Sequence, residues 1–295
     1  MRVAFASEPA YPDRPNEDFI GATADAVVLL DGASIPPGIT SACSHSVRWY
    51  SHTLGSTLLA EMTQSAGPLP ELLAQGIKHV TSLHDFTCDL THGGSPSATV
   101  IMLRQTADHL DWLVLGDSTL ILDTRTPNPM VICDDRLEQV AAPHRTRLDS
   151  LPGGTPEHAE ARRQYVETLG QYRNRDGGFW VASTDPLAAD QAFTGTIPTD
   201  GICAAALLTD GAADAVNRYR LTTWRRLLGT LAQDGPAELI RQVREAERSD
   251  PRGERWPRSK PHDDATAAYC CPSEGVLGDP VEALASGFRD EFERA

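Results

Sequence analysis

Short apolar runs alternate along this chain with longer segments of helical spacing. The apolar runs are rich in aliphatic residues and are bounded by glycine, proline or polar residues, which is typical of strands. They cover residues 2–7, 26–32, 97–104, 110–117, 119–124, 130–135, 178–183, 201–211 and 264–271. Helical spacing of apolar residues, or a proline in the first turn, predicts helices over 43–64, 70–90, 156–174, 221–232, 236–248 and 279–293. The polar, proline-bearing segments 143–155 and 249–262 are predicted to be loops.

The order of these elements predicts the fold class. Strands come first, then two long helices, a meander of strands, more helices and a few closing strands. Short turns between the mid-chain strands favour antiparallel pairing, and the alternation typical of a doubly wound sheet is absent. We therefore expect an α+β fold, in which a central antiparallel β-sandwich is flanked by helices on both outer faces (four-layer αββα). We expect a single domain over residues 1–295, ending in a short helical extension at about 279–293.

The acidic composition argues against two classes of partner. The formal net charge is −15 and the isoelectric point is near 4.9, so the surface repels nucleic-acid phosphates and anionic membranes. We expect no nucleic-acid partner and no membrane partner. No apolar run approaches the roughly 18 residues that a membrane span needs. The N-terminus becomes polar too early for a signal peptide, so a cytoplasmic location is expected.

The cysteines do not form a recognisable motif. None of them makes a CxxC pair, and most lie in apolar or helical stretches, which is typical of reduced, buried thiols. They are Cys43, Cys88, Cys133, Cys203, Cys270 and Cys271. His45 and His52 are spaced as neighbours on one face of the first predicted helix, but the sequence shows no companions for them that would complete a zinc site.

Acidic residues recur where the predicted strands begin or end. Asp31 and Asp210 each end an apolar run and precede a glycine, in VVLLDGAS and AALLTDGAAD. Asp117 ends another run, in WLVLGDS, and Asp263 precedes the last strand. Carboxylates held at the ends of buried strands supply the hard oxygen ligands that Mg²⁺ and Mn²⁺ prefer. Two cations that share a carboxylate can activate a water for attack on phosphorus.

A simpler interpretation exists for each acid taken alone. Asp-Gly is a common turn dipeptide, and it begins at residues 31, 176, 200, 210 and 234 of this chain. Turns explain the dipeptides at 176, 200 and 234, because their surroundings are polar. The argument for a metal site rests on the joint occurrence of the acids, each at the edge of a predicted strand.

Together these residues resemble the metal-dependent protein phosphatases of type 2C, the PPM family, in its bacterial form. The matching segments are NEDF, VLLDGAS, SATVIML, LVLGDSTLIL, LLTDGAAD and HDDATAAY, which follow the family's order from residue 16 to residue 269. The resemblance implies a β-sandwich enzyme that hydrolyses phosphoserine or phosphothreonine in proteins. It also implies two Mg²⁺ or Mn²⁺ ions bridged by the attacking hydroxide, with provision for a third ion.

The resemblance also implies roles for individual residues, of which Asp31, Asp210 and Asp263 are the catalytic ones. Asp31 would bridge the two metals, and the carbonyl of Gly32 would contact one of them. Asp210 and Asp263 would complete the protein ligands of the other metal.

Four further acids have more distant roles in the family's pattern. Glu17 and Asp18 would act mainly through metal-bound waters, and Asp117 and Asp214 match the acids that hold a third, weaker metal. Asp264 replaces the asparagine that often follows the last ligand, which adds a negative charge.

Two departures concern the groups that should handle phosphate. Animal members have a histidine where this chain has Ala33, so another group must protonate the leaving oxygen. The family places an arginine three residues before the Asn of NED, whereas Arg14 lies two residues before Asn16. We expect Arg14 to bind substrate phosphate, with a solvent-exposed arginine as the alternative. His262 is either a proton shuttle or a residue that only flanks a loop.

Three functions remain open from the sequence. The first is an active phosphatase, expected to be monomeric, whose substrate is a phosphorylated protein. The second is a catalytically weak or inactive relative that binds a phosphoprotein as a regulator, which the missing histidine and the shifted arginine would suit. The third is a phosphatase of a small phosphoester.

Overall fold

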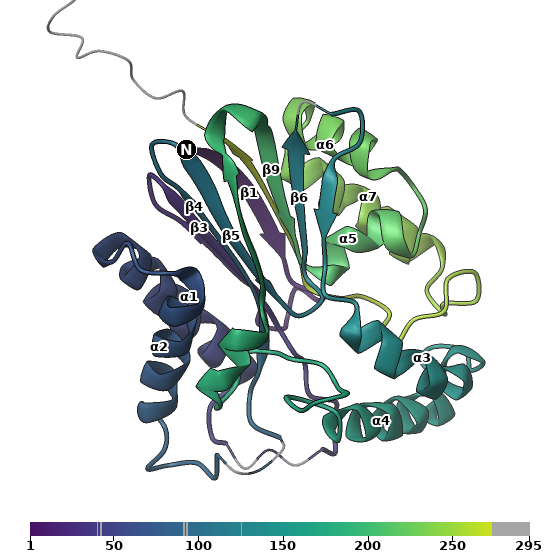
Figure 1. The fold of residues 1–295 in the computed structure, drawn as a ribbon. Helices are drawn as coiled ribbons and strands as arrows, with labels where there is room; N and C mark the ends of the chain where they lie inside the picture. The colour runs from purple at the N-terminus through teal and green to yellow at the C-terminus, as the bar shows by residue number, and fades with distance from the viewer. Residues whose placement is uncertain (40, 42, 91, 93, 125, 273–295) are drawn as a thin grey trace, which may run out of the picture.

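The structure is a computed structural model that describes residues 1–39, 41, 43–90, 92, 94–124 and 126–272. In this part of the chain, two five-stranded antiparallel sheets face each other (Figure 1). The first sheet has the order β1 (Arg2–Glu8), β10 (Ala265–Cys271), β9 (Ile202–Leu208), β6 (Thr119–Thr124), β7 (Met130–Ile132). The second has the order β2 (Phe19–Ala22), β3 (Ala26–Gly32), β4 (Ala98–Gln105), β5 (His109–Leu115), β8 (Phe193–Pro198). The predicted antiparallel sandwich is confirmed.

The central strands are continuous apolar runs because both of their faces are covered. In β3, Val28 and Leu30 pack against helices, whereas Val27 and Leu29 point into the layer between the sheets. All four side chains are 0% exposed. Alternate residues of β9 divide in the same way between an outer and an inner core. Two-sided burial of an antiparallel strand therefore requires two sheets with helices outside both.

Helices supply the two outer layers. One sheet is covered by α1 (Val47–Gln64) and α2 (Leu69–Ser82), and the other by α5 (Asp210–Asn217), α6 (Trp224–Gln233) and α7 (Pro236–Ser249) (Figure 1). Ser46 caps α1 by accepting a hydrogen bond from the Trp49 N–H at 3.1 Å. The hydroxyl of Tyr50, which is 0% exposed, donates to the Ser183 carbonyl at 2.7 Å. These layers confirm the αββα arrangement.

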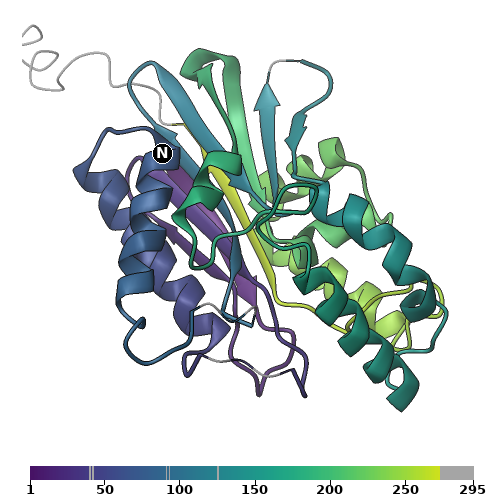
Figure 2. The ribbon, with the colours of Figure 1, turned by 60° about the horizontal axis from the view of Figure 1, so that its bottom comes forward.

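Two further helices form a hairpin outside the four layers. They are α3 (Arg136–Asp149) and α4 (Pro156–Gly170), and they lie at one end of the sandwich (Figure 2). The predicted loop over 143–155 is therefore wrong in its first half, since α3 continues through Pro143. This proline is exposed, and packing of α3 against α4 compensates for the hydrogen bond that it removes. In the described part of the chain, no helix combines the length and the apolar character that a membrane crossing needs.

Three other expectations need correction. Residues 178–183 form only isolated bridges, such as Ala182 with Ala98, because Gly178 turns the chain tightly against the Tyr172 carbonyl. The strand β8 was not predicted, since it is an edge strand with four of its six residues exposed. Asp210 begins α5 and does not end a strand. The predicted extension at 279–293 lies outside the described residues. Two short 3₁₀ turns, Pro186–Gln191 and Thr199–Gly201, complete the connections.

Candidate metal centre

The central strands of both sheets bring the predicted acids to the same end of the sandwich. Asp31 lies near the end of β3, opposite Thr99 on β4. Asp210 follows β9 from the other sheet, and its backbone N–H donates to Oδ2 of Asp31 at 3.3 Å. Asp117 lies in the turn between β5 and β6. The fold therefore joins acids that are far apart in the sequence.

Mutual repulsion dominates the electrostatics of this cluster. Burial raises the pKa of Asp31 well above its usual range, and the charges of Asp210, Asp18, Asp263 and Asp117 raise it further. Burial, followed by the charge of Asp210, raises the pKa of Asp117 to about 7. Such a cluster is costly while every member is ionised, unless cations compensate the charge.

The glycines beside Asp31 and Asp210 allow other backbone segments to approach. A Cβ on Gly32 would lie 2.6 Å from the Glu17 carbonyl oxygen. A Cβ on Gly211 would lie 2.1 Å from the Asp264 carbonyl oxygen. Both distances are too short for any side chain, so these positions require glycine to bring the acid-bearing segments together.

The substitution Gly211→Ala is therefore expected to destabilise the protein by about 1–3 kcal/mol, because the backbone of Asp264 must move. Gly229→Ala is the matched control, since Gly229 lies within α6 and a Cβ there meets no atom within 4 Å. Alanine at this helical position should stabilise the protein by roughly 0.5–1 kcal/mol. Urea unfolding of both variants measures the difference in their free energies of unfolding. Equal changes in the two variants would contradict the close approach at Gly211.

Asp264 positions the N-terminal acid segment. Asp264 is 9% exposed, and its carboxylate accepts backbone N–H bonds from Ala10 and Glu17, both at 2.7 Å. Glu17 in turn accepts a hydrogen bond from the Ser34 hydroxyl at 2.5 Å. An asparagine could accept only one of the two backbone bonds without turning its amide toward the other donor. The added charge noted in the sequence thus fixes the segment that carries Glu17.

Side chains of α1 hold the same segment from the other side. Arg48 donates to the Asn16 carbonyl at 2.7 Å, and Ser51 donates to the Glu17 carbonyl at 2.6 Å. His52 donates from Nε2 to the Asp18 carbonyl at 3.1 Å. His52 is therefore a structural residue that keeps residues 16–18 against the sandwich.

Asp18 provides an observation that fits a bound cation. It is 3% exposed, and its Oδ2 accepts a hydrogen bond from the Thr266 hydroxyl at 2.7 Å. Its Oδ1 is buried and has no hydrogen-bond partner among the described residues. A buried carboxylate oxygen without a partner costs free energy, which a cation or a cation-bound water would recover. The oxygen-only set of donors around it suits Mg²⁺ or Mn²⁺.

Two of the predicted ligands form ion pairs. Asp263 accepts from Lys260 at 2.6 Å, and Asp214 accepts from Arg218 at 2.6 Å. Burial opposes the charge of Lys260, but Asp263 and Asp210 outweigh that effect and raise the pKa of the ammonium. Burial raises the pKa of Asp214 to about 6 even though Arg218 lowers it. A third metal at Asp214 would therefore compete with Arg218.

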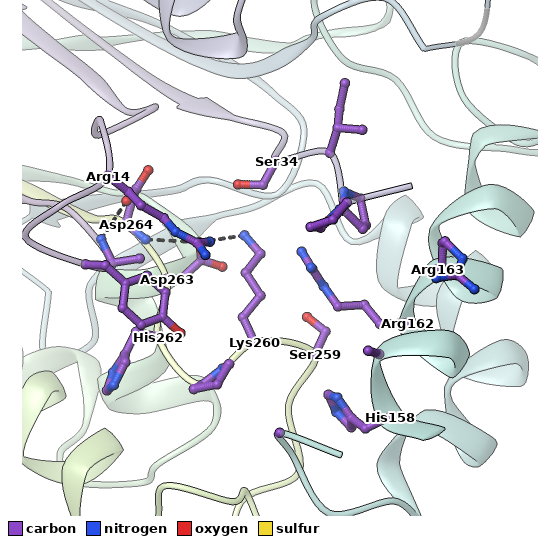
Figure 3. Close-up of a pocket in the computed structure, with 18 of the residues that line it drawn as sticks. Arg14, Ser34, His158, Arg162, Arg163, Ser259, Lys260, His262, Asp263 and Asp264 are labelled. Carbon is purple, nitrogen blue, oxygen red and sulfur yellow. Dashed lines mark hydrogen bonds and ion pairs between the residues drawn. The ribbon is translucent and has the colours of Figure 1, made fainter. Parts of the chain in front are cut away.

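A cavity of about 680 Å³ opens beside the acids and carries several cations (Figure 3). Arg14, Arg162, Arg163 and Lys260 are among the residues that line it. Arg162 extends from α4 toward Lys260 (Figure 3), and burial lowers the pKa of its guanidinium. Its Nε is buried and finds no partner in the described ranges. Arg163 is instead paired with Glu160.

The remaining predicted residues at the cavity have identifiable contacts. The guanidinium of Arg14 lies 4.9 Å from the centre of the Tyr11 ring, at the cavity wall. His262 donates from Nδ1 to Glu247 at 2.8 Å, and Glu247 also pairs with Arg244 at 2.8 Å. These contacts account for the position of His262 without a role in proton transfer.

Comparison with solved structures defines the fold. No family model and no curated protein matches the sequence. The serine/threonine phosphatase PstP/Ppp of Mycobacterium tuberculosis is 15% identical with a TM-score of 0.58, over 92% of this chain and 99% of that one. The serine/threonine phosphatase Stp1 of Staphylococcus aureus is 14% identical with a TM-score of 0.56, over 92% and 95% of the two chains. The chain has the fold of the bacterial type 2C phosphatases.

A third structure with the type 2C fold contains metal. It is the catalytic domain of PstP in complex with two manganese ions, which is 17% identical with a TM-score of 0.55, over 92% of this chain and 97% of that one. The ions belong to that structure, and at this identity the likeness shows the fold alone.

Neither Arg162 nor Lys260 was predicted from the sequence. Arg162 lies on α4, which was recognised as a helix without a motif, and Lys260 lies in a segment predicted to be a loop. Their only sequence signal is positive charge in a strongly acidic chain. The cavity that gives them a shared environment arises from tertiary structure.

The metal-free protein is expected to lose stability as the pH rises from about 4 to about 7. Burial raises the pKa values of Asp117 and Asp214 from 3.8 to about 7 and about 6. Each acid therefore contributes stability that is fully present below its unfolded pKa and is lost as the pH rises through its folded pKa. One pKa unit corresponds to about 1.4 kcal/mol, so Asp117 alone accounts for a few kcal/mol.

Thermal unfolding in a chelator at about pH 5 and about pH 8 tests this dependence. The melting temperature should be higher at the lower pH, and Mn²⁺ should recover the difference at the higher pH. Equal melting temperatures at the two pH values, or no effect of Mn²⁺, would contradict a cluster of uncompensated acids.

Proposed function

We propose that this protein is a metal-dependent phosphatase that hydrolyses phosphoserine or phosphothreonine in proteins. The observation that carries the proposal is the unpartnered buried carboxylate oxygen of Asp18, within an acid cluster that adjoins a cavity lined by cations. A cluster that needs divalent cations and a cavity that attracts an anion suit hydrolysis of a phosphate ester. The likeness in fold to bacterial serine/threonine phosphatases supports this choice.

Two Mg²⁺ or Mn²⁺ ions would be held by protein oxygens of the acid cluster. When bound, they would supply an activated water and neutralise negative charge on the phosphate. We assign the direct ligands as Asp31, the Gly32 carbonyl, Asp210 and Asp263. Glu17 and Asp18 would orient cation-bound waters from the segment that Asp264 and α1 hold in place. Asp117 and Asp214 would hold a third, weaker ion once Arg218 is displaced.

The chain's cations would bind and orient the substrate phosphate. Arg162 is the strongest candidate, because its guanidinium reaches into the cavity without an ion-pair partner in the described part of the chain. Lys260 lies between Arg162 and the acids, where it can neutralise phosphate charge (Figure 3). Arg14 would contribute from the rim. A guanidinium beside a phosphate offers paired donors, which position the ester relative to the acids.

A phosphorylated protein is the proposed substrate class, and a monomeric single domain over 1–295 is the proposed unit. The net charge of −15 supports the absence of nucleic-acid and anionic-membrane partners. A cytoplasmic location is proposed because none of the cysteines forms a disulfide, as is usual for proteins in a reducing compartment.

A substrate panel tests the proposal. The purified chain is assayed with Mn²⁺ against a phosphothreonine peptide, a phosphoserine peptide and a small phosphomonoester. We expect kcat/KM for the peptides to exceed that for the small ester. The reverse order would make a small phosphoester the substrate. Peptide binding that survives removal of metal, without turnover under any divalent cation, would identify a phosphoprotein-binding regulator and overturn the proposal.

A further inference from the structure

Four potential zinc ligands meet at a point where two chain segments cross. Cys43 and His45 lie in the connection from β3 to α1, and His84 and Cys88 lie in the turn that follows α2. One ligand atom from each residue lies within 4.8 Å of all the others. We propose that Cys43, His45, His84 and Cys88 bind one structural Zn²⁺ ion, separate from the acid cluster.

The distances between the ligand atoms suit tetrahedral zinc. Nδ1 of His84 lies 3.4 Å from Sγ of Cys43. Nδ1 of His45 lies 3.7 Å from Sγ of Cys43 and 3.5 Å from Sγ of Cys88. A tetrahedron with Zn–S near 2.3 Å and Zn–N near 2.05 Å has sulfur–nitrogen edges of about 3.5–3.6 Å. Three of the four sulfur–nitrogen edges thus match those that the ion requires, and all four ligand atoms lie within 4.8 Å of one another.

Local backbone structure explains how the two pairs face one point. The Cys88 N–H donates to the His84 carbonyl at 3.1 Å, so these residues lie one helical turn apart on the same side. Cys43 and His45 flank a single residue just before Ser46, the residue that caps α1. The pairs are therefore C-x-H and H-x₃-C. Because they come together only in the fold, the expectation that His45 lacks companions was wrong.

The surroundings of the four residues also fit a metal site. The backbone N–H of Ser44 donates to Sγ of Cys88 at 3.3 Å, and the N–H of His45 donates to Sγ of Cys43 at 3.4 Å. Donors of this kind stabilise a zinc thiolate from outside the ligand set. The ring of Trp49 covers the site, 4.1 Å from the His45 ring and 5.1 Å from the His84 ring between centroids.

His84 is hard to explain without a bound ion. It is 1% exposed, its Nδ1 faces the Cys43 sulfur, and its Nε2 has no hydrogen-bond partner among the described residues. A buried imidazole without a strong partner costs free energy. Coordination through Nδ1 would give the buried ring a strong partner and fix its orientation, with the proton on Nε2.

The donor atoms separate this site from the acid cluster. Two sulfurs and two imidazole nitrogens in a tetrahedron favour Zn²⁺, whereas carboxylate oxygens favour Mg²⁺ and Mn²⁺. Four protein ligands leave no open position, so the ion would be structural and not catalytic. It would tie the end of α2 to the connection between β3 and α1. Ser34 and Pro36, which line the cavity, belong to that same connection.

Metal binding by the reduced chain tests the proposal. The stripped protein is titrated with Zn²⁺ in excess Mg²⁺, which occupies the acid cluster, and with Co²⁺ as a spectroscopic substitute. We expect one tightly bound Zn²⁺ per chain. The Co²⁺ form should show the intense visible bands of a tetrahedral site together with a thiolate charge-transfer band. Removal of Zn²⁺ should lower the melting temperature by several degrees.

Variants locate the ion. Cys43→Ser and Cys88→Ser should each weaken Zn²⁺ binding by at least about 100-fold and remove or diminish the thiolate band. Cys203→Ser is the matched control, since Cys203 is an exposed cysteine on β9, and it should leave both unchanged. Asp31→Asn should also leave Zn²⁺ binding unchanged, which separates this test from that of the proposed function.

Two results would overturn the proposal. One is a wild-type chain that binds no Zn²⁺ with its thiols reduced, even where Cys43 and Cys88 were joined in a disulfide before reduction. The other is a Co²⁺ spectrum that lacks thiolate bands. Both are read from the wild type, so they do not depend on whether the cysteine variants fold.

Discussion

Replacing Asp31 by asparagine is expected to reduce the metal-dependent kcat/KM for a phosphothreonine peptide by about 10³-fold or more. Asparagine preserves the shape of the side chain but removes the charge that would bridge two cations. The same change should raise the stability of the metal-free protein near neutral pH. Burial and the neighbouring acids raise the pKa of Asp31, which shows that its ionised form is disfavoured there. Loss of activity with gain of metal-free stability distinguishes a metal ligand from a structural residue.

Asp176→Asn is the matched control for this prediction. Asp176 also precedes a glycine, but it is exposed and lies in a turn outside the acid cluster. Its replacement should leave activity and stability unchanged. Peptide hydrolysis and thermal unfolding of the two variants give the comparison. A D31N enzyme that keeps activity within about tenfold of the wild type would exclude Asp31 as the bridging ligand.

Replacing Arg162 by alanine is expected to lower kcat/KM for the phosphopeptide by roughly 10²-fold. Its guanidinium lies in the cavity beside Lys260 without a carboxylate partner in the described ranges, so phosphate is the anion that it can bind. Because burial disfavours the charged form of this guanidinium, removing it should not destabilise the free protein through lost ion pairs. Most of the effect should therefore appear in substrate binding and turnover.

Arg163→Ala is the control, because Arg163 is the next residue of α4 and is paired with Glu160. Its replacement should change kcat/KM by no more than about threefold, as expected for a partly exposed ion pair. Steady-state kinetics with the phosphopeptide, together with the melting temperatures, resolve the two positions. Equal losses in both variants would show that α4 acts through its packing and not through the Arg162 charge.

The sequence predicts the centre of the fold better than its edges. Strands such as β3 are recognisable because both faces are buried, which makes them continuous apolar runs. The edge strand β8 has no such run, since much of it is exposed and Gly195 packs against Trp112. The helix α3 was missed because Pro143 is an unfavourable residue within it. At such positions tertiary packing determines the secondary structure, and the local sequence gives little indication of it.

The same distinction applies to the sites. Acids such as Asp31 and Asp210 could be predicted because each lies beside a glycine at the end of an apolar run. The positioning role of Asp264 depends on backbone N–H groups of Ala10 and Glu17, whose approach no local pattern reveals.

The cationic side chains of the cavity and the proposed zinc ligands could not be assigned to sites from the sequence, for a related reason. Arg162 acquires its surroundings only when separate segments meet. The same holds for the four proposed zinc ligands, Cys43, His45, His84 and Cys88. The residue types indicate what these side chains can bind, but only the fold brings them close to one another.

The most direct measurement is the rate of phosphothreonine-peptide hydrolysis by the chelator-stripped protein as Mn²⁺ is added. We predict no turnover without metal, and a saturable rise in rate that follows occupancy of the acid cluster and is absent in D31N. Turnover by the fully stripped protein, or no turnover at saturating Mn²⁺ and Mg²⁺, would contradict a metal-dependent phosphatase.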